Sequence, residues 1–505
     1  MKTFLMYRDR DFGTEPVFPF NEKELSSDLE LDVLFSAMAV GDPFIYDVVR
    51  KTILCSGDNC IDTILYRQEI LKDCIANPRT VRELYSLPVE LVENKRKKWY
   101  VIFTSTPGSV LASSIESLEM SVMLLKKLKH IIETHNVGFK SEGFARFSRM
   151  ILNELNGTYF HEIDTHLKNL RFTGGVLLSA ELGKGNEGYN YTLCKQIKEK
   201  RFSIKRIFTG RRKVYSFKLH PRDEAGQRKL SELRDRAINN TANSLARSVD
   251  HIEDFFRQLR FELAFYLGCL NLHEKLDSMG EPLSYPDPLP RDENSCSFRN
   301  LYEVCLALTK NESIIGNDLD ARGKSLFVIT GANQGGKSTL LRSIGLVQIM
   351  MQCGMFVPAE SFSAGVCAGI FTHFRKEEDG GMKSGKLDEE LGRMSLIIDK
   401  IKEGSLLLLN ESFAATNERE GSEIARHIVT ALHEKGVRIF FVTHLYEFAG
   451  SLKKRGTTGT LFLRAERGEN GRRSYKIIEG EPLATAFGED LYRDIFAEDH
   501  SEIII

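Results

Sequence analysis

The sequence lacks three features, and each absence excludes a class of protein. Its nine cysteines are scattered, odd in number and without any Cys-x-x-Cys pair, which argues against a disulfide scaffold or a zinc site and for reduced thiols. The net charge is −1, so no global charge indicates nucleic acid, although a local patch still could. We find no run of ~18 apolar residues and no signal peptide, so we expect a cytoplasmic protein without a membrane span.

The composition is that of a large globular chain with several domains. Its 505 residues are 42% hydrophobic, which is enough for two to four domains with real cores. We expect an arm over residues 1–27 and helical patterns over residues 28–295, which end in a stretch with four prolines. Strands and helices alternate over residues 296–505. The expected fold class is therefore multidomain, α plus α/β.

Two long helices are predicted within the helical region. Apolar residues recur every three or four positions from Val110 to Asn136. The stretch from Gly226 to Ser278 contains no proline and keeps a 4,3 spacing, which predicts about 80 Å of helix if unbroken. Two shorter helices with a kink are the alternative. Between the long helices, residues 173–225 should form a small β-containing insert, in which residues 211–220 alternate like a strand.

The strongest motif is a glycine-rich loop between an apolar strand, SLFVIT, and an amphipathic helix. It fits G-x-x-x-x-G-K-[ST], a pattern whose backbone N–H groups surround phosphate oxygens at the start of a helix. Its lysine suits the β- and γ-phosphates of ATP, and its serine suits Mg²⁺. The nucleotide-binding residues are Gly331, Ala332, Asn333, Gln334, Gly335, Gly336, Lys337, Ser338 and Thr339.

Two further strands should bring chemistry to the same edge of a sheet. LLLLNE predicts a buried strand that delivers Asn410 and Glu411 to the ligand-binding edge. Glu411 is placed to orient or deprotonate an attacking water, and a glutamate without chemistry is the alternative. The strand RIFFVTH ends at His444, which we interpret as a sensor of the γ-phosphate rather than a structural histidine.

These motifs together resemble the MutS mismatch-repair ATPases. The loop TGANQGGKSTLLRSIG is similar to the TGPNMGGKST loop of that family, and FVPAESFSAGVCAGIFTHF, NES and VTH continue the likeness. Weaker helical matches extend it over most of residues 28–465. The resemblance implies an ABC-type P-loop ATPase domain that dimerises, with Ser384 of one subunit near the γ-phosphate held by the other. It also implies long helices that act as levers and an insert that acts as a clamp on DNA.

The departures from the family pattern limit these expectations. Family members usually have Asp-Glu where this chain has Asn410-Glu411, so the Mg²⁺ shell, held by Ser338 and through water by Asn410, should be weaker and turnover slow. Ala332 replaces a proline. We expect no mismatch-reading domain upstream and no nuclease-like domain downstream, and hence no mismatch recognition by an inserted aromatic residue.

A local excess of positive charge lies in the insert. Residues 195–229 carry 13 Lys or Arg against three acids, and backbone or shape recognition of DNA is the favoured reading over a solvated helix tip. The candidate contacts are Lys205, Arg206, Arg211, Arg212 and Lys213.

The favoured function is a dimeric, homo- or paralogue-paired, ATP- and Mg²⁺-dependent clamp on DNA. The alternatives are a clamp on a ribosome or structured RNA, a nucleotide-binding scaffold with little hydrolysis, and a subunit of a transport ATPase.

Overall fold

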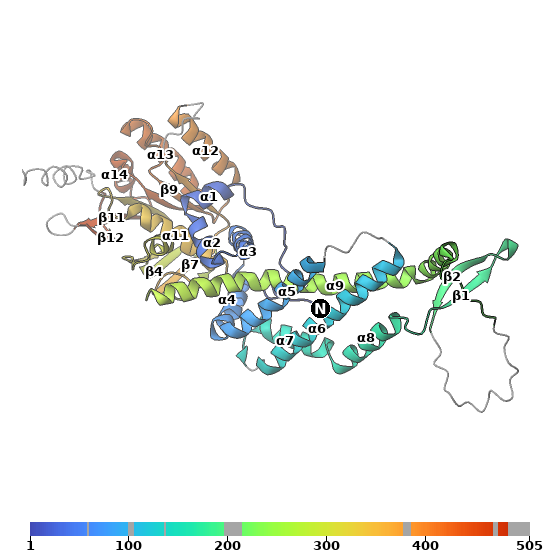
Figure 1. Cartoon of the computed structure of the whole chain (residues 1–505). Helices are drawn as coiled ribbons and strands as arrows, with labels where there is room; N and C mark the ends of the chain where they lie inside the picture. Colours follow the sequence, from blue (N-terminus) through green and yellow to red (C-terminus); the bar gives the residue numbers. More distant parts are fainter. Residues whose placement is uncertain are drawn as a thin grey trace, which may run out of the picture. The chain divides into compact units, whose positions relative to one another are not determined.

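The computed structural model describes residues 1–57, 60–98, 106–135, 138–195, 215–376, 385–467 and 473–482. The chain divides into two compact units, whose elements are labelled in Figure 1. The helical unit comprises Met1–Thr3, Arg82–Val137 and Arg146–Arg260. The sheet unit comprises Phe4–Val81, Gly138–Ala145 and Phe261–Ile505. The domain boundaries expected at residues 27 and 295 stay predictions.

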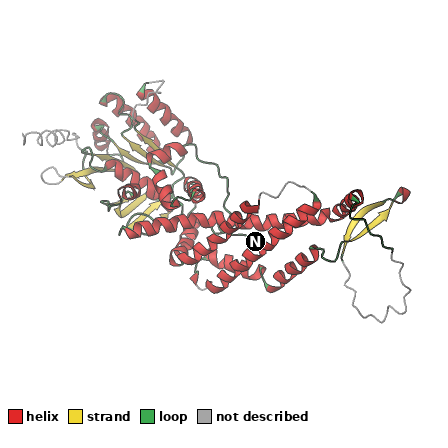
Figure 2. Cartoon of the chain, in the orientation of Figure 1, coloured by secondary structure: helices red, strands yellow, loops and turns green. Residues whose placement is uncertain are grey.

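Long helices dominate the helical unit, as the colouring of Figure 2 shows. The longest, α9, is a single helix of 55 residues from Glu224 to Ser278, of which the residues to Arg260 belong to this unit. The kinked alternative is therefore not what the structure has. The other helices with residues in this unit are α5 (Pro78–Lys98), α6 (Pro107–His135), α7 (Glu142–Glu154) and α8 (Gly157–Leu170).

Helix α6 agrees with the sequence pattern. It starts at Pro107, where a missing N–H costs nothing in a first turn. Within the described residues, α6 alone is long and apolar enough to cross a membrane by length and composition. However, its stripe of apolar residues is buried inside the protein, as in a core helix: Leu111, Ile115, Leu118, Val122, Leu125, Leu128 and Ile132.

The insert contains a short hairpin. Strand β1 (Leu177–Leu182) pairs antiparallel with β2 (Gly188–Cys194), which confirms β-structure after residue 173. The described part of the strand predicted at 211–220, residues 215–220, has no strand conformation. Alternating side chains do not make a strand by themselves, because a strand also needs a partner for its backbone hydrogen bonds.

A six-stranded sheet is the core of the sheet unit. Its order is β12-β11-β6-β10-β9-β8, and all neighbours are parallel except β11 and β12. The strands inside are apolar on both faces, as a sheet covered on both sides requires. The bounds are β6 (Leu326–Thr330), β8 (Ile370–Phe374), β9 (Leu406–Asn410), β10 (Arg438–Val442), β11 (Thr460–Arg467) and β12 (Arg473–Glu479).

A second sheet has four strands in the order β3-β7-β4-β5. Its strands are β3 (Asp287–Leu289), β4 (Ser295–Leu301), β5 (Asn317–Arg322) and β7 (Ser361–Gly365). The helices of the unit are α1 (Glu22–Asp28), α2 (Leu31–Ala39), α3 (Pro43–Leu54), α4 (Ile61–Ala76), α10 (Val304–Lys310), α11 (Lys337–Gln352), α12 (Lys386–Lys400), α13 (Glu418–Glu434) and α14 (Tyr446–Arg455).

Helix α11, which follows the glycine loop, is buried on nearly every side. The run from Leu346 to Gln352 is buried without interruption, so the expected amphipathic helix is wrong. The polar residues in this buried run are two glutamines, and the side chain of each hydrogen-bonds to neighbouring backbone. Gln348 donates to the carbonyl of Gly365 at 3.1 Å, and Gln352 accepts from the N–H of Cys367 at 2.8 Å. A helix whose polar residues are satisfied by neighbouring backbone can lie fully inside the protein.

The N-terminal arm is held by a buried carboxylate from α9. Glu262 is fully buried and accepts from the N–H of Leu5 at 2.7 Å and of Phe12 at 3.0 Å. Residues 4–21 thereby become part of the sheet unit, although their sequence has little periodicity.

Candidate nucleotide-binding site

The three predicted motifs lie at the carboxyl ends of three adjacent parallel strands. Strand β6 leads into the glycine loop and α11, β10 pairs with β6, and β9 pairs with β10. The carboxyl ends of parallel strands are where α/β sheets bind ligands. The order and direction of these strands alone therefore bring residues near positions 337, 410 and 443 together at one edge of the sheet.

The loop backbone requires glycine at two positions. Gly331 has φ 114° and Gly336 has φ 88°, in the left-handed region that other residues rarely adopt. A Cβ on Gly331 would lie 3.0 Å from the N atom of Ala465, and one on Gly336 would lie 3.1 Å from the O atom of Tyr475. The hairpin of β11 and β12 thus lies directly behind the loop and leaves no room for side chains there.

Lys337 is held inside the loop that it follows. Its side-chain Nζ donates to the carbonyls of Gly331 and Ala332, both at 2.8 Å. Burial lowers the pKa of Lys337 to about 8, while the charge of Glu411 acts in the opposite direction. A buried ammonium whose partners are neutral carbonyls is under-compensated, and an anionic phosphate would supply the missing charge.

Ser338 and Asn410 contact each other directly. The Ser338 hydroxyl donates to Oδ1 of Asn410 at 2.8 Å, so the loop and the end of β9 present two oxygen atoms at one point. Such oxygen donors fit Mg²⁺, which prefers hard ligands and keeps several of its waters. No cluster of three or more His, Cys, Asp or Glu suited to a metal occurs in the described residues.

The chain turns sharply after Asn410. Glu411 has φ 53° and Phe413 has φ 65°, and each such conformation costs on the order of 1–3 kcal/mol. Three contacts hold the turn: the Glu411 N–H donates to the Val442 carbonyl at 2.8 Å, the Ser412 hydroxyl donates to the His373 carbonyl at 2.7 Å, and the Phe413 ring is fully buried. Strain kept at such a site by its surroundings is consistent with a positioned functional group.

Glu411 and His444 form a pair. Nε2 of His444 lies 3.2 Å from Oε1 of Glu411, and because an ionised carboxylate only accepts hydrogen bonds, the histidine nitrogen is the donor. This hydrogen bond is the main cause that lowers the pKa of Glu411, and the charges of Lys337 and Arg375 act in the same direction. Glu411 is therefore an ionised carboxylate at neutral pH.

The structure describes some of the predicted site residues and leaves others out. Ala332, Gln334 and Thr339 lie in or beside the loop. Ser384 and the candidate DNA contacts lie outside the described residues: Lys205, Arg206, Arg211, Arg212 and Lys213.

Two arginines at the site were not predicted from the sequence. Nη1 of Arg375, which directly follows β8, lies 3.7 Å from Oε2 of Glu411. The sequence does contain a signal for Arg375, because it is a cationic residue directly after a run typical of a buried strand. Arg473, the first residue of β12, donates to the Gln334 side chain. No local pattern indicates this second contact, because the two residues are 139 positions apart.

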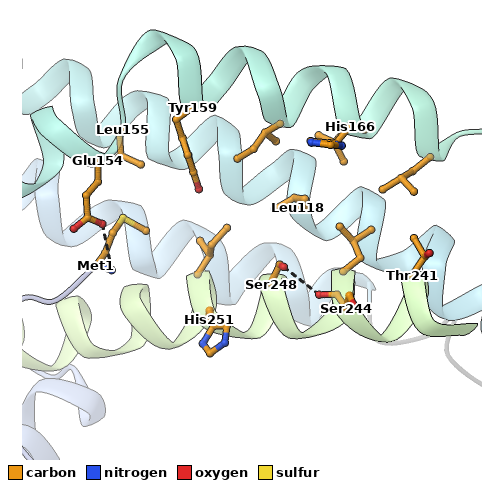
Figure 3. A pocket seen from close by; sticks show the side chains of 15 residues that line it. Met1, Leu118, Glu154, Leu155, Tyr159, His166, Thr241, Ser244, Ser248 and His251 are labelled. Atoms are coloured by element: carbon orange, nitrogen blue, oxygen red, sulfur yellow. Dashed lines mark hydrogen bonds and ion pairs between the residues drawn. The ribbon is translucent and has the colours of Figure 1, made fainter. Parts of the chain in front are cut away.

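A separate cavity of about 620 Å³ lies in the helical unit between α6, α8 and α9 (Figure 3). Its lining is mostly apolar, and its ion pair joins the Met1 amine to Glu154 at 3.4 Å. It contains none of the phosphate-binding or strand-end residues. Size alone therefore does not identify the chemical site in this chain.

The fold and site together define a P-loop nucleotide-binding domain. Residues 327–489 match the family model described as MutS domain V, an ABC-type ATPase domain, and residues 59–279 match the model described as the MutS2 N-terminal domain. The chain belongs to the MutS family.

Curated relatives agree with this assignment. The DNA mismatch repair protein MutS of Methanosarcina barkeri is 23% identical over 436 residues, which cover 78% of this chain and 48% of that protein. MutS of Thermotoga sp. (strain RQ2) is 33% identical over 172 residues, 34% of this chain and 22% of that protein. MutS of Chloroflexus aurantiacus is 27% identical over 223 residues, 43% of this chain and 23% of that protein. The chain thus spans half or less of the length of these relatives.

Proposed function

We propose that this chain is a MutS-type ATPase that uses ATP and Mg²⁺ and binds DNA as a dimer. The observation that supports it most is the meeting of Lys337, the Ser338–Asn410 pair and the Glu411–His444 pair at three adjacent strand ends. Each pair has a separate task in phosphoryl transfer, where catalysis is mainly positioning and charge stabilisation.

The chain's own residues perform the steps. The loop N–H groups and Lys337 bind the phosphates, and Ser338 and Asn410 would hold Mg²⁺, which neutralises charge on the β- and γ-phosphates. Glu411 accepts a hydrogen bond from the attacking water and orients it. His444 exchanges its hydrogen bond between Glu411 and the terminal phosphate, and so reports whether that phosphate is present.

Turnover is slow in this proposal because of Asn410. Its amide oxygen accepts a hydrogen bond but carries no charge, and charge-assisted bonds are roughly twice as strong as neutral ones. The same observation favours a second candidate, a nucleotide-binding scaffold with little hydrolysis.

DNA binding and dimer formation rest on the family and on charge. The relatives carry the name DNA mismatch repair protein, and residues 195–229 have 13 basic residues against three acidic ones. In this proposal the insert is the clamp, α9 is a lever, Ser384 reaches the partner's γ-phosphate, and the protein is cytoplasmic. Structured RNA is the alternative polymer for the same patch.

The site assignment is tested by Lys337→Ala. Loss of the buried ammonium should abolish ATP binding, measured by calorimetry, because Nζ of Lys337 lies inside the loop against the Gly331 and Ala332 carbonyls. Lys324→Ala, a lysine just before β6, is the matched control and should leave ATP affinity unchanged. Unaltered ATP affinity in Lys337→Ala would refute the site.

A further inference from the structure

The segment Tyr215–Arg222, which leads into α9, lies within the basic stretch 195–229, in the part that the structure describes, and combines cations with exposed aromatic rings. Its sequence, YSFKLHPR, interleaves two aromatic residues with cationic ones and contains no acid. Tyr215 is 87% exposed and Phe217 is 82% exposed. Exposed aromatic rings beside cations are the combination that single-strand nucleic-acid binders use, because each ring can stack on a base while the cations attract the backbone.

The segment is fixed to the start of α9. A Cβ on Gly226 would lie 2.8 Å from Cδ2 of Leu219, so the Leu219 side chain lies against the first turn of the helix. The side chain of Gln227 donates to the Pro221 carbonyl at 3.1 Å, and the N–H of Asp223 donates to the His220 carbonyl at 2.9 Å. Leu219 faces the helix while the neighbouring side chains are exposed.

The cations beside the rings are available for a ligand. Lys218 and Arg222 are exposed, and within the described residues neither has an ion pair. By contrast Lys229, one turn into α9, is paired with Glu232 at 2.8 Å. Asp223, the nearest acid, is engaged in the hydrogen bond that its Oδ1 accepts from the Gly226 N–H at 2.9 Å.

We propose that Tyr215 and Phe217 stack against unpaired DNA bases, with Lys218 and Arg222 on the adjoining phosphates, so that the chain prefers forked or single-stranded DNA to blunt duplex. Base–aromatic stacking needs exposed rings and tolerates any base, and in a duplex the base faces are covered by their neighbours. Cations beside such rings provide the sequence-independent attraction to phosphate. The inference rests on the proposed DNA binding and assigns its substrate class.

The experiment compares full-length protein on three labelled ligands by fluorescence anisotropy: an oligothymidylate, a blunt duplex, and a fork made of that duplex with unpaired arms. Wild type should bind the fork more tightly than the duplex. Tyr215→Ala/Phe217→Ala should lose roughly tenfold in affinity per stacked base on the fork and the oligothymidylate. It should keep its duplex affinity and its salt dependence, because no charge has been removed.

Two controls separate stacking from other effects. When position 217 carries Trp instead of Ala (Phe217→Trp), fork binding should return, since a larger ring still stacks. Tyr446→Ala removes a Tyr that is 41% exposed on α14 and should change nothing. Lys218→Glu/Arg222→Glu should weaken binding to all three ligands and flatten the salt dependence.

The outcomes are distinguishable. If wild type binds fork and duplex equally and the aromatic variant matches it on both, DNA binding stands and the stacking site is refuted. If wild type binds none of the three ligands, DNA binding itself fails, and the stacking site with it. If the aromatic residues matter only for a matching RNA fork, DNA is the wrong polymer.

Discussion

At the scale of single residues, the site depends on how Asn410 and Glu411 leave β9. Glu411 adopts a left-handed backbone conformation, held by the Val442 carbonyl and by the buried ring of Phe413. This turn sends the Asn410 side chain to Ser338 and the Glu411 side chain to His444. In the proposed mechanism, the amide at 410 stands where a carboxylate would carry charge, while Glu411, the carboxylate proposed to orient the water, stays in place. This arrangement predicts a weakened enzyme rather than an inactive one.

The substitution Asn410→Asp should strengthen Mg²⁺ binding. The carboxylate keeps the acceptor for the Ser338 hydroxyl and adds a charge, and the gain should be about tenfold in the Mg²⁺ concentration required for ATP binding. ATP hydrolysis, measured as phosphate release, should rise as well. If neither form hydrolyses ATP although both bind it, the scaffold is the correct function.

Lys337 should make ATP binding depend on pH. Its pKa is lowered to about 8 by burial, and phosphate contact raises it again. Affinity should therefore be constant below pH ~8 and fall by about tenfold per pH unit above it, until the pKa of the bound state is reached. Lys337→Arg, which stays protonated, should bind with a flat profile over the same range. A flat wild-type profile up to pH ~10 would contradict this account.

At the scale of elements, apolar periodicity and motifs predicted most of the site's strands and the long helix. Structure that depends on contacts between distant residues could not be predicted. The strand LLLLN, the strand RIFFV and the unbroken helix from Glu224 follow directly from apolar spacing and the absence of proline. The strand predicted at 211–220 is wrong for its described part, residues 215–220, which pair with no described strand. The arm at 1–27 could not be assigned because Leu5 and Phe12 bond to Glu262, about 250 residues away. Long-range contacts between single residues leave no periodic trace.

Two glycines within helices should respond oppositely to alanine. A Cβ on Gly268 of α9 would lie 2.8 Å from Cγ2 of Val49, so Gly268→Ala should destabilise the fold by about 1–3 kcal/mol through overpacking. A Cβ on Gly392 of α12 would meet nothing within 4 Å, so Gly392→Ala should stabilise by up to about 1 kcal/mol. Thermal melting of both variants checks the pair, and equal shifts would show that α9 does not pack as described.

At the scale of the whole molecule, nucleotide and DNA binding should be linked. Residues of α9 belong to both compact units, and the basic residues of the insert precede this helix in the chain. If ATP changes the affinity for DNA by some factor, DNA must change the affinity for ATP by the same factor. Linkage of this kind is what distinguishes a nucleotide-switched clamp from a protein that happens to bind both ligands.

The most direct test that ATP binding and DNA binding are linked is a pair of titrations with Glu411→Gln. This variant should bind ATP and hydrolyse it slowly. DNA affinity is measured with and without ATP–Mg²⁺, and ATP affinity is measured with and without forked DNA. If nucleotide and DNA binding are linked, the two factors should be equal, at roughly 5- to 150-fold. Two affinities that are each independent of the other ligand would contradict this linkage.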